Sequence, residues 1–140
     1  MPPDKKIQHL ADTWLFSSCS QRELARIARA CDEVEVKAGK ELIAQGSLGR
    51  EMFVIRDGNA TVKRNGRKVA SIGPGGYFGE LSLLSSLPRN STIVAESDMS
   101  LLVLGAREFG ALLDEVPSIG HKLLGAMAKR LSEQDSKIQG

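Results

Sequence analysis

The stretch that decides how this chain folds is Gly75-Gly76-Tyr77-Phe78-Gly79-Glu80-Leu81-Ser82-Leu83-Leu84-Ser85-Ser86-Leu87-Pro88-Arg89-Asn90-Ser91-Thr92. Its glycines, short apolar turn and Pro-Arg pair interrupt a sequence that otherwise reads as strands and turns. Glycine lets the backbone approach a ligand closely, and the first N–H groups of a helical turn favour an anion. Arg89 lies nine residues after Glu80, where its planar guanidinium could close on the same anion. We therefore predict an anion-binding site in this stretch.

The sequence on both sides of this stretch has the period of two that is typical of strands. Short strands are expected at 34–36, 42–43, 52–55, 60–62, 69–72, 92–95 and 101–104. Asp57-Gly58 and Asn65-Gly66 predict tight type I′ turns, whose two central residues both need positive φ. Many short antiparallel strands joined by such turns indicate a mainly β fold. We expect an antiparallel β-roll or jelly roll over 33–105, with 78–92 as its special segment.

Helices are expected on both flanks of the roll, at 5–31 and as a pair within 106–138, in a single domain over 1–140. Ser20-Gln21-Arg22-Glu23 is a capping box that starts one of the N-terminal helices. Pro117 is expected in the first turn of the last helix. This helix carries apolar residues that we expect to form one stripe: Ile119, Leu123, Leu124, Met127 and Leu131. The stripe could serve as core, as a seam between two copies or as a lid over a ligand.

Composition excludes several classes of function. Hydrophobic residues make up 41% of the chain and charged residues 26%, a globular balance. A net charge of +2 is too small to predict binding to nucleic acid or to an anionic membrane. The chain has neither a membrane-spanning apolar run nor the apolar region of a signal peptide at its start, so we expect a cytoplasmic protein. Cys19 and Cys31 have no neighbouring His or Cys, and we expect no metal site and no cofactor.

The motifs quoted above resemble those of a known family. Gly79-Glu80-Leu81-Ser82-Leu83, followed by Pro88-Arg89-Asn90-Ser91-Thr92, is similar to the phosphate-binding cassette of cyclic-nucleotide-binding domains. This family includes the bacterial catabolite activator and the regulatory subunits of cAMP-dependent protein kinase. Gln45-Gly46-Ser47, 53–58 and 72–76 also match glycine-marked strands and turns of the family. Together these motifs are far more specific than a lone glycine motif.

The resemblance implies a ligand and a role for each cassette residue. Glu80 is expected to accept a hydrogen bond from a ribose 2′-hydroxyl, and Arg89 to pair with the cyclic phosphate. The backbone N–H groups of Ser82 and Asn90 are expected to add to the phosphate site. Gly79, Leu81 and Ser91 complete the ligand-binding set within the cassette. The ligand is expected to be cAMP, although Asn90 stands where the family has residues linked to cAMP or cGMP preference, so cGMP stays open.

Two further groups of residues follow from the same resemblance. An apolar wall for the base is expected from Leu81 together with Val62, Val69, Ala70 and Ile72. A lid is expected from the C-terminal helix, with Leu124, Met127, Arg130 and Leu131 as candidates. In this mechanism, phosphate binding pulls the cassette inward and relieves or creates an apolar contact near Leu84 and Leu87. The helix from Ser118 then closes over the base.

The residues leave other functions open. Taken singly, Glu80 and Arg89 are typical of solvated surface residues, and a module of this fold that binds no nucleotide is one alternative. The regulatory fragment of a larger transcription factor or signalling protein is another. An enzyme on a jelly roll would need metal ligands on strands, but His9 and His121 lie on predicted helices. We expect a non-enzymatic sensor that does not bind DNA by itself, whose effector domain or partner protein is unknown and which could form a homodimer through its C-terminal helix.

Overall fold

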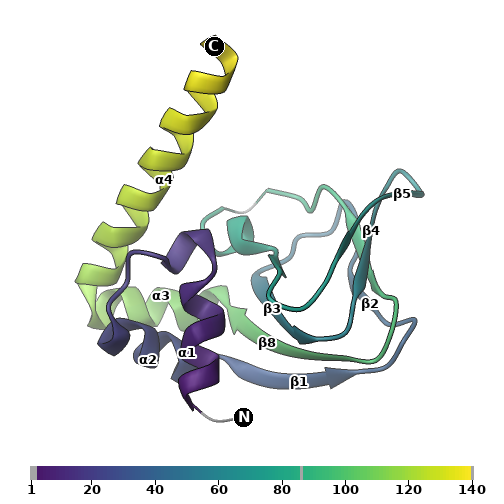
Figure 1. Ribbon diagram of the computed structural model, residues 1–140, viewed down its shortest axis with the longest axis horizontal. Coiled ribbons are helices and arrows are strands. Elements are labelled where there is room, and N and C mark those ends of the chain that lie inside the picture. The colour runs from purple at the N-terminus through teal and green to yellow at the C-terminus, as the bar shows by residue number, and fades with distance from the viewer. Residues whose placement is uncertain (1–2, 86, 140) are drawn as a thin grey trace. The chain divides into compact units, whose positions relative to one another are not determined.

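The computed structural model describes residues 3–85 and 87–139, and the side chains of 5–85 and 87–133. The described chain divides into two compact units (Figure 1). One is a β unit, Ala30–Phe109, and the other is a helical unit formed by the segments before and after it. Within the described residues, no helix is long and apolar enough to cross a lipid bilayer.

The β unit is an antiparallel roll of two sheets, which confirms the predicted fold class. Its strands are β1 (Asp32–Val36), β2 (Glu41–Ile43), β3 (Glu51–Asp57), β4 (Ala60–Arg64), β5 (Arg67–Ile72), β6 (Tyr77–Phe78), β7 (Thr92–Ala95) and β8 (Met99–Gly105). In the described chain the first sheet has the order β1-β8-β3-β6 and the second has the order β2-β7-β4-β5. Every predicted strand is present. The short strand β6 was not predicted, because only two residues pair with β3.

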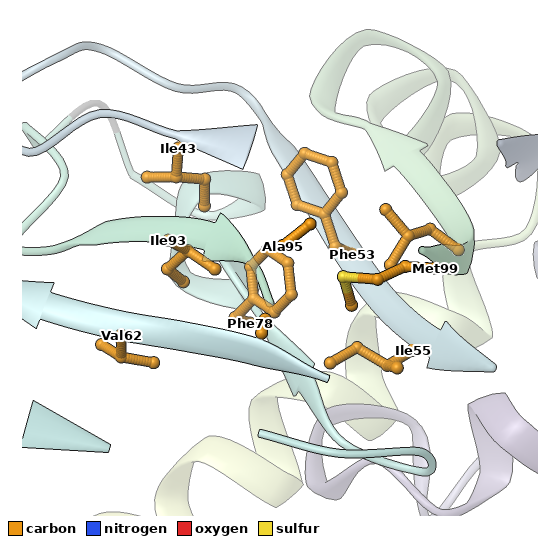
Figure 2. Close-up of a cluster of buried hydrophobic side chains, with 10 residues drawn as sticks. Ile43, Phe53, Ile55, Val62, Phe78, Ile93, Ala95 and Met99 are labelled. Atoms are coloured by element: carbon orange, nitrogen blue, oxygen red, sulfur yellow. The ribbon is translucent and has the colours of Figure 1, made fainter. Parts of the chain in front are cut away.

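Side chains of both sheets meet in one hydrophobic core (Figure 2). Ile43, Val62 and Ile93 come from one sheet, and Phe53 and Ile55 come from the other. The rings of Phe53 and Phe78 stack with their centroids 4.9 Å apart. The chain is poor in aromatic residues, and this pair supplies large apolar area at the centre of the roll. The packed core fixes the strands that carry the functional segment.

The two predicted hairpin turns have different outcomes. Asn65 has φ 54° and Gly66 has φ 80°, so both central residues are left-handed, as a type I′ turn requires. At the other turn, Gly58 has φ 88° but Asp57 is still part of β3. The type I′ prediction is therefore wrong at Asp57-Gly58, where the register of β3 against β8 shifts near Asp57.

The helical unit is built from α1 (Pro3–Ala11), the 3-10 turn η1 (Trp14–Phe16), α2 (Gln21–Ala30), the end of α3 (Ala106–Glu115) and α4 (Pro117–Gln139). The predicted capping box is confirmed, since the Ser20 N–H donates to Glu23 Oε1 at 2.7 Å and the Glu23 N–H donates to Ser20 Oγ at 3.2 Å. Pro117 begins α4 as predicted. Turn η1, which was not predicted, contacts both α1 and α4.

The apolar residues of α4 do not form one stripe, which corrects the prediction. Ile119 and Leu123, four residues apart, are buried. Leu124 and Leu131 are 64% and 63% exposed. A step of one residue turns an α-helix by about 100°, so Leu124 faces away from the side that Leu123 buries. Apolar spacing alone does not show which of two adjacent leucines faces the core.

Candidate functional site

Arg89 is the most unusual charged residue of the β unit. It follows Pro88 in the segment between the short 3-10 turn η2 (Glu80–Leu83) and β7, and its side chain is only 8% exposed. Arginine is rarely buried unless it is paired. Arg89 Nη2 donates to the backbone oxygen of Glu51 at 2.9 Å, but Nη1 is buried with no hydrogen-bond partner among the described residues. A buried guanidinium that has an N–H donor without a partner is suited to bind an anion.

The surroundings of Arg89 affect its pKa in two opposite directions. Burial lowers the pKa of the guanidinium, and the nearby carboxylate of Glu51 acts to raise it, with a net lowering. An arginine side chain remains protonated in proteins despite such shifts, because its ordinary pKa is above 12. The positive charge of Arg89 is therefore kept at a site that water solvates poorly, where a charged ligand would interact strongly.

Two glycines make room for this guanidinium. A Cβ atom at Gly79 would lie 2.6 Å from Arg89 Nη1 and 2.7 Å from the Glu51 backbone oxygen. A Cβ atom at Gly49 would lie 1.8 Å from Arg89 Nε. Gly79 also has φ 80°, which a residue with a side chain rarely adopts. The structure thus brings Arg89 next to Gly79, and Glu80 follows directly in the chain.

Turn η2 begins immediately after Gly79. Glu80 is half-buried and Leu81 is exposed. The Ser82 N–H donates to the Gly79 backbone oxygen at 3.0 Å, as the i→i−3 pattern of a 3-10 turn requires. The expectation that this N–H group points toward a phosphate does not hold in this conformation, because the turn itself uses the donor. Of the donors of η2, the Ser82 N–H is therefore used within the turn in this conformation.

A loop before β3 anchors the second half of the cassette. The Arg89 N–H donates to the Ser47 backbone oxygen, and the Gly46 N–H donates to the Arg89 backbone oxygen, each at 2.8 Å. The Gln45 N–H donates to Thr92 Oγ1 at 3.0 Å. These three bonds fix the backbone on both sides of the Arg89 side chain. Ser47 was not predicted to support the site, although the Gln45-Gly46-Ser47 motif that contains it was noted.

Arg64, at the end of β4, is a second cation at the cassette that sequence reasoning missed. Its Nε donates to the Asn90 backbone oxygen at 3.3 Å, and its Nη2 lies 3.4 Å from Ser91 Oγ. Ser91 is buried, and its hydroxyl donates to Asn90 Oδ1 at 3.0 Å. The strand pairing that places Lys63 opposite Thr92 brings Arg64 to this position. The pairing between strands far apart in sequence was the missing signal.

The pairing of β4 with β5 shows where the residues predicted to form the apolar wall lie. Ala70 pairs with Val62 and Ile72 pairs with Ala60, so Ala70 and Ile72 share the face on which Val62 enters the core. Val69 lies at the register shift between β4 and β5 and is 52% exposed. The assignment of Val69 to the wall stays a prediction. Val62 is itself part of the hydrophobic core.

The predicted lid residues lie in the helical unit. Leu124 and Leu131 are exposed and Met127 is half-buried. The Arg130 guanidinium lies over the indole of Trp14, with 4.6 Å from Cζ to the ring centroid. This cation–π contact joins α4 to η1. In this conformation Arg130 stacks on an aromatic ring of the protein.

A hollow of about 280 Å³ also lies in the β unit. Val36, Leu42 and Phe53 provide part of its apolar lining, and Glu51 lies beside them. Neither Glu80 nor Arg89 lines this hollow. The candidate site is therefore defined by the buried charge and the glycines around it, and not by the size of a cavity.

Comparisons with known proteins identify related sequences. Residues 33–116 match the family model of the cyclic nucleotide-binding domain. The regulatory subunit of cAMP-dependent protein kinase from Aspergillus niger is 38% identical over 112 residues, which cover 79% of this chain and 27% of that protein. The cyclic AMP receptor protein of Thermus thermophilus is 34% identical over 105 residues, which cover 71% of this chain and 49% of that protein. The chain thus spans about a quarter to a half of the length of these relatives.

Solved structures have the same fold. The N-terminal domain of a transcriptional regulator from Streptomyces coelicolor A3(2) has a TM-score of 0.85 at 29% identity, covering 92% of this chain and 93% of that one. The regulatory domain of Toxoplasma gondii PKA, crystallised with cAMP, has a TM-score of 0.73 at 30% identity, covering 79% of this chain and 44% of that one. With the family model matching more than half of its residues, this chain belongs to the cyclic nucleotide-binding domain family.

Proposed function

We propose that this chain is a regulatory module that binds a 3′,5′-cyclic nucleotide, cAMP in the first place, at Arg89 and Glu80. The observation that carries the proposal is the buried Arg89 guanidinium, whose Nη1 has no partner among the described residues and lies beside Gly79. A cyclic phosphate brings a single negative charge and exocyclic oxygens that accept such a donor. The proposed chemistry is binding.

Each part of the ligand has a partner in this proposal. Arg89 Nη1 donates to an exocyclic phosphate oxygen, while Nη2 stays on the Glu51 carbonyl. Glu80 accepts the hydrogen bond of the ribose 2′-hydroxyl, which a 3′,5′-cyclic ribonucleotide keeps unesterified. Ala70 and Ile72 provide apolar contact for the base. Arg64 holds Asn90 and Ser91 in place through the bonds described above.

The choice of cAMP over cGMP depends on the residue after Arg89. Asn90 is exposed, and its Oδ1 accepts a hydrogen bond from Ser91. The side-chain NH₂ group donates and Oδ1 keeps a second lone pair, so Asn90 can bond to either base. The named relatives from Aspergillus niger and Thermus thermophilus are cAMP proteins. We therefore place cAMP first and treat cGMP as the competing ligand in every titration.

The output of the module is proposed to be a movement of α4. A sensor needs two conformations and a ligand that favours one of them. Leu124 and Leu131 are exposed on α4, so apolar area is available for burial when α4 moves, against the ligand site or in a dimer with a second copy. Trp14 is the single tryptophan of the chain and stacks under Arg130. Its fluorescence therefore reports on the position of α4.

The experiment is thermal unfolding with and without nucleotide. A ligand that binds only the folded state at a hundredfold excess over its Kd adds about 2.7 kcal/mol of stability. We expect cAMP to raise the Tm, cGMP to raise it less, and linear 5′-AMP to leave it unchanged. Mass measurement in the same samples reports whether cAMP changes the oligomeric state. An unchanged Tm at millimolar concentrations of both cyclic nucleotides would favour a module that binds no nucleotide.

Removal of the Glu80 charge tests the ribose contact. In Glu80→Gln we expect cAMP to bind about tenfold more weakly, because a hydrogen bond to a charged acceptor contributes about 1.5 kcal/mol or more. The affinity for 2′-deoxy-cAMP should change by less than about twofold, because the hydroxyl is missing. The matched control is Glu41→Gln, an exposed carboxylate on β2. Equal losses for both nucleotides in Glu80→Gln would contradict the assigned contact.

A further inference from the structure

The helical unit contains a hollow of about 460 Å³ lined by residues of α2 and of the first turns of α4. We call this hollow the α2–α4 groove. Four of its lining residues are basic, namely Arg22, Arg26, Arg29 and Lys122, and one is acidic, Glu23. The whole chain carries a net charge of only +2. Positive charge is therefore concentrated in this groove.

The three arginines lie on one face of α2. Their spacing of four and then three residues repeats the helical period. The first and last are seven residues apart, and a rise of about 1.5 Å per residue separates them by roughly 10 Å along the helix. Arg22 and Arg29 are exposed, and Arg26 is partly buried between them. The groove therefore offers cations along two turns of helix.

The carboxylate of Glu23 forms the floor of the groove, and hydrogen bonds satisfy its oxygens. Glu23 is buried and accepts hydrogen bonds from the Ser20 N–H at 2.7 Å, from Ser118 Oγ at 2.6 Å and from Lys122 Nζ. The pair of Glu23 and Lys122 is electrically neutral. Because the floor is fully bonded and spans α2 and α4, it keeps the groove in shape and attracts no further cation.

The charges at the edge of the groove are not all compensated. Arg26 Nη2 pairs with Glu115 at 2.6 Å. Arg22 and Arg29 have no ion-pair partner among the side chains that the structure describes. Two positive charges on opposite ends of the arginine row are thus available to a partner.

We propose that the α2–α4 groove docks an acidic peptide segment of a partner protein, whose carboxylates pair with Arg22 and Arg29. The bidentate fork of arginine matches a carboxylate. Side chains on one side of an extended peptide are two or four positions apart, or about 7 and 13 Å at 3.3 Å per residue, and these spacings bracket the separation of roughly 10 Å between the arginines. This function is separate from nucleotide binding in the β unit.

Nucleic acid fits the same groove less well. The lining has no aromatic side chain on which a base could stack. The carboxylate of Glu115 beside Arg26 would repel a continuous row of phosphates, whereas a peptide can place a neutral residue there. These two observations favour a peptide of spaced acidic residues.

The test is fluorescence anisotropy with a fluorescein-labelled peptide of alternating Glu and Ser. The Arg22→Glu, Arg29→Glu double variant should bind it at least about tenfold more weakly than the unmodified chain, because two surface attractions of up to about 1 kcal/mol each become repulsions. The control is Lys63→Glu, Arg67→Glu on the exposed hairpin of β4 and β5, which changes the net charge equally. This control should stay within about twofold of the unmodified chain.

Added salt should weaken the binding of the peptide to the unmodified chain. Circular dichroism checks that both double variants fold, and Arg22→Gln, Arg29→Gln gives a milder loss if charge reversal perturbs α2. Equal weakening in the groove and control variants would overturn the proposal, as would no binding to the unmodified chain at millimolar peptide. Tighter binding of an equally charged single-stranded oligonucleotide than of the peptide would also overturn it. A change in cAMP affinity is not expected in the groove variants.

Discussion

Among the side chains described, each unit contains one buried charge, Glu23 or Arg89, and the two are stabilised differently. Glu23 in the helical unit has donors from Ser20, Ser118 and Lys122, and although burial opposes its ionisation, these hydrogen bonds lower its pKa to about 2. Arg89 in the β unit has one backbone acceptor, the Glu51 oxygen, and an Nη1 without a partner among the described residues. A buried charge that is fully bonded holds a fold together, whereas one that lacks a partner is suited to bind a ligand.

This difference gives each charge its own expected phenotype. Loss of Glu23 should affect stability and spare nucleotide binding, because its partners all belong to the helical unit. Disturbance of Arg89 should affect binding and spare stability, because a desolvated cation with an unused donor contributes little to folding. Both statements can be measured on the same samples by thermal unfolding and calorimetry.

The largest expected effect is on stability, in Glu23→Gln. The change keeps the shape and the capping geometry but leaves the Lys122 charge without its partner, so we expect a loss of about 3 kcal/mol in the free energy of unfolding. Glu115→Gln is the control, because Glu115 pairs with Arg26 at the surface and should cost less than about 1 kcal/mol. Urea unfolding at neutral pH measures both changes. Similar losses in the two variants would contradict the special role of Glu23.

The pH dependence of unfolding tests the origin of this effect. The folded-state pKa of Glu23, about 2, lies below the ordinary value of 4.5. Its stabilising contribution is therefore complete above about pH 5 and is lost as the pH falls from 4.5 toward 2. The free energy of unfolding of Glu23→Gln should decline less over this range than that of the unmodified chain. Parallel curves for the two proteins would rule out Glu23 as the group responsible.

The second effect is on binding, in Gly49→Ala. The new Cβ would overlap Arg89 Nε and displace the guanidinium from the Glu51 carbonyl. We expect cAMP to bind about thirtyfold more weakly, about 2 kcal/mol. The stability should fall by about 1 kcal/mol, the low end of the range for overpacking, because the guanidinium is at the end of a flexible side chain. Gly110→Ala, with nothing within 4 Å of its Cβ position, should leave the affinity unchanged. An unaltered affinity in Gly49→Ala would place the ligand elsewhere.

The smallest effect is on the reactivity of Cys19. Burial, with the charge of Glu23 adding to it and that of Lys122 opposing it, raises the pKa of the Cys19 thiol to about 11. Alkylation at pH 8 should thus be about a hundredfold slower than for a thiol with the ordinary pKa of 9.0. In Glu23→Gln the reaction should become a few times faster, because one source of repulsion is removed. Mass spectrometry of the labelled peptide separates Cys19 from Cys31, and an unchanged rate would show that Glu23 and Cys19 are not coupled.

Local patterns in the sequence predicted much of the fold. The alternation of apolar residues located every predicted strand, and Asn65-Gly66 located a turn, because both signals depend only on neighbouring residues. The capping box at Ser20 and Glu23 is local in the same way. The Gly79-Glu80 and Pro88-Arg89 motifs led to the family. Where neighbouring residues decide the local structure, the sequence alone was sufficient to predict it.

The parts that the sequence did not predict depend on distant contacts. Gly49 precedes Arg89 by forty residues, and its role is visible only once the guanidinium lies against it. The side of the sheet to which Val69 points depends on the register shift between β4 and β5, because a shift of one residue reverses that side. Arg64 reaches Asn90 through strand pairing, and Leu124 faces away from the buried side of α4. Each of these outcomes follows from tertiary packing, which no local pattern contains.

The most direct test of the account is a calorimetric titration of the unmodified chain and of Arg89→Ala with cAMP. Truncation of a charged group that pairs with a buried phosphate should weaken binding by about 3 kcal/mol or more, which is at least about a hundredfold in Kd. Unfolding of Arg89→Ala without nucleotide should remain within about 1 kcal/mol of the unmodified chain. Equal Kd values for the two proteins would contradict the central claim that the unsatisfied guanidinium is the phosphate site.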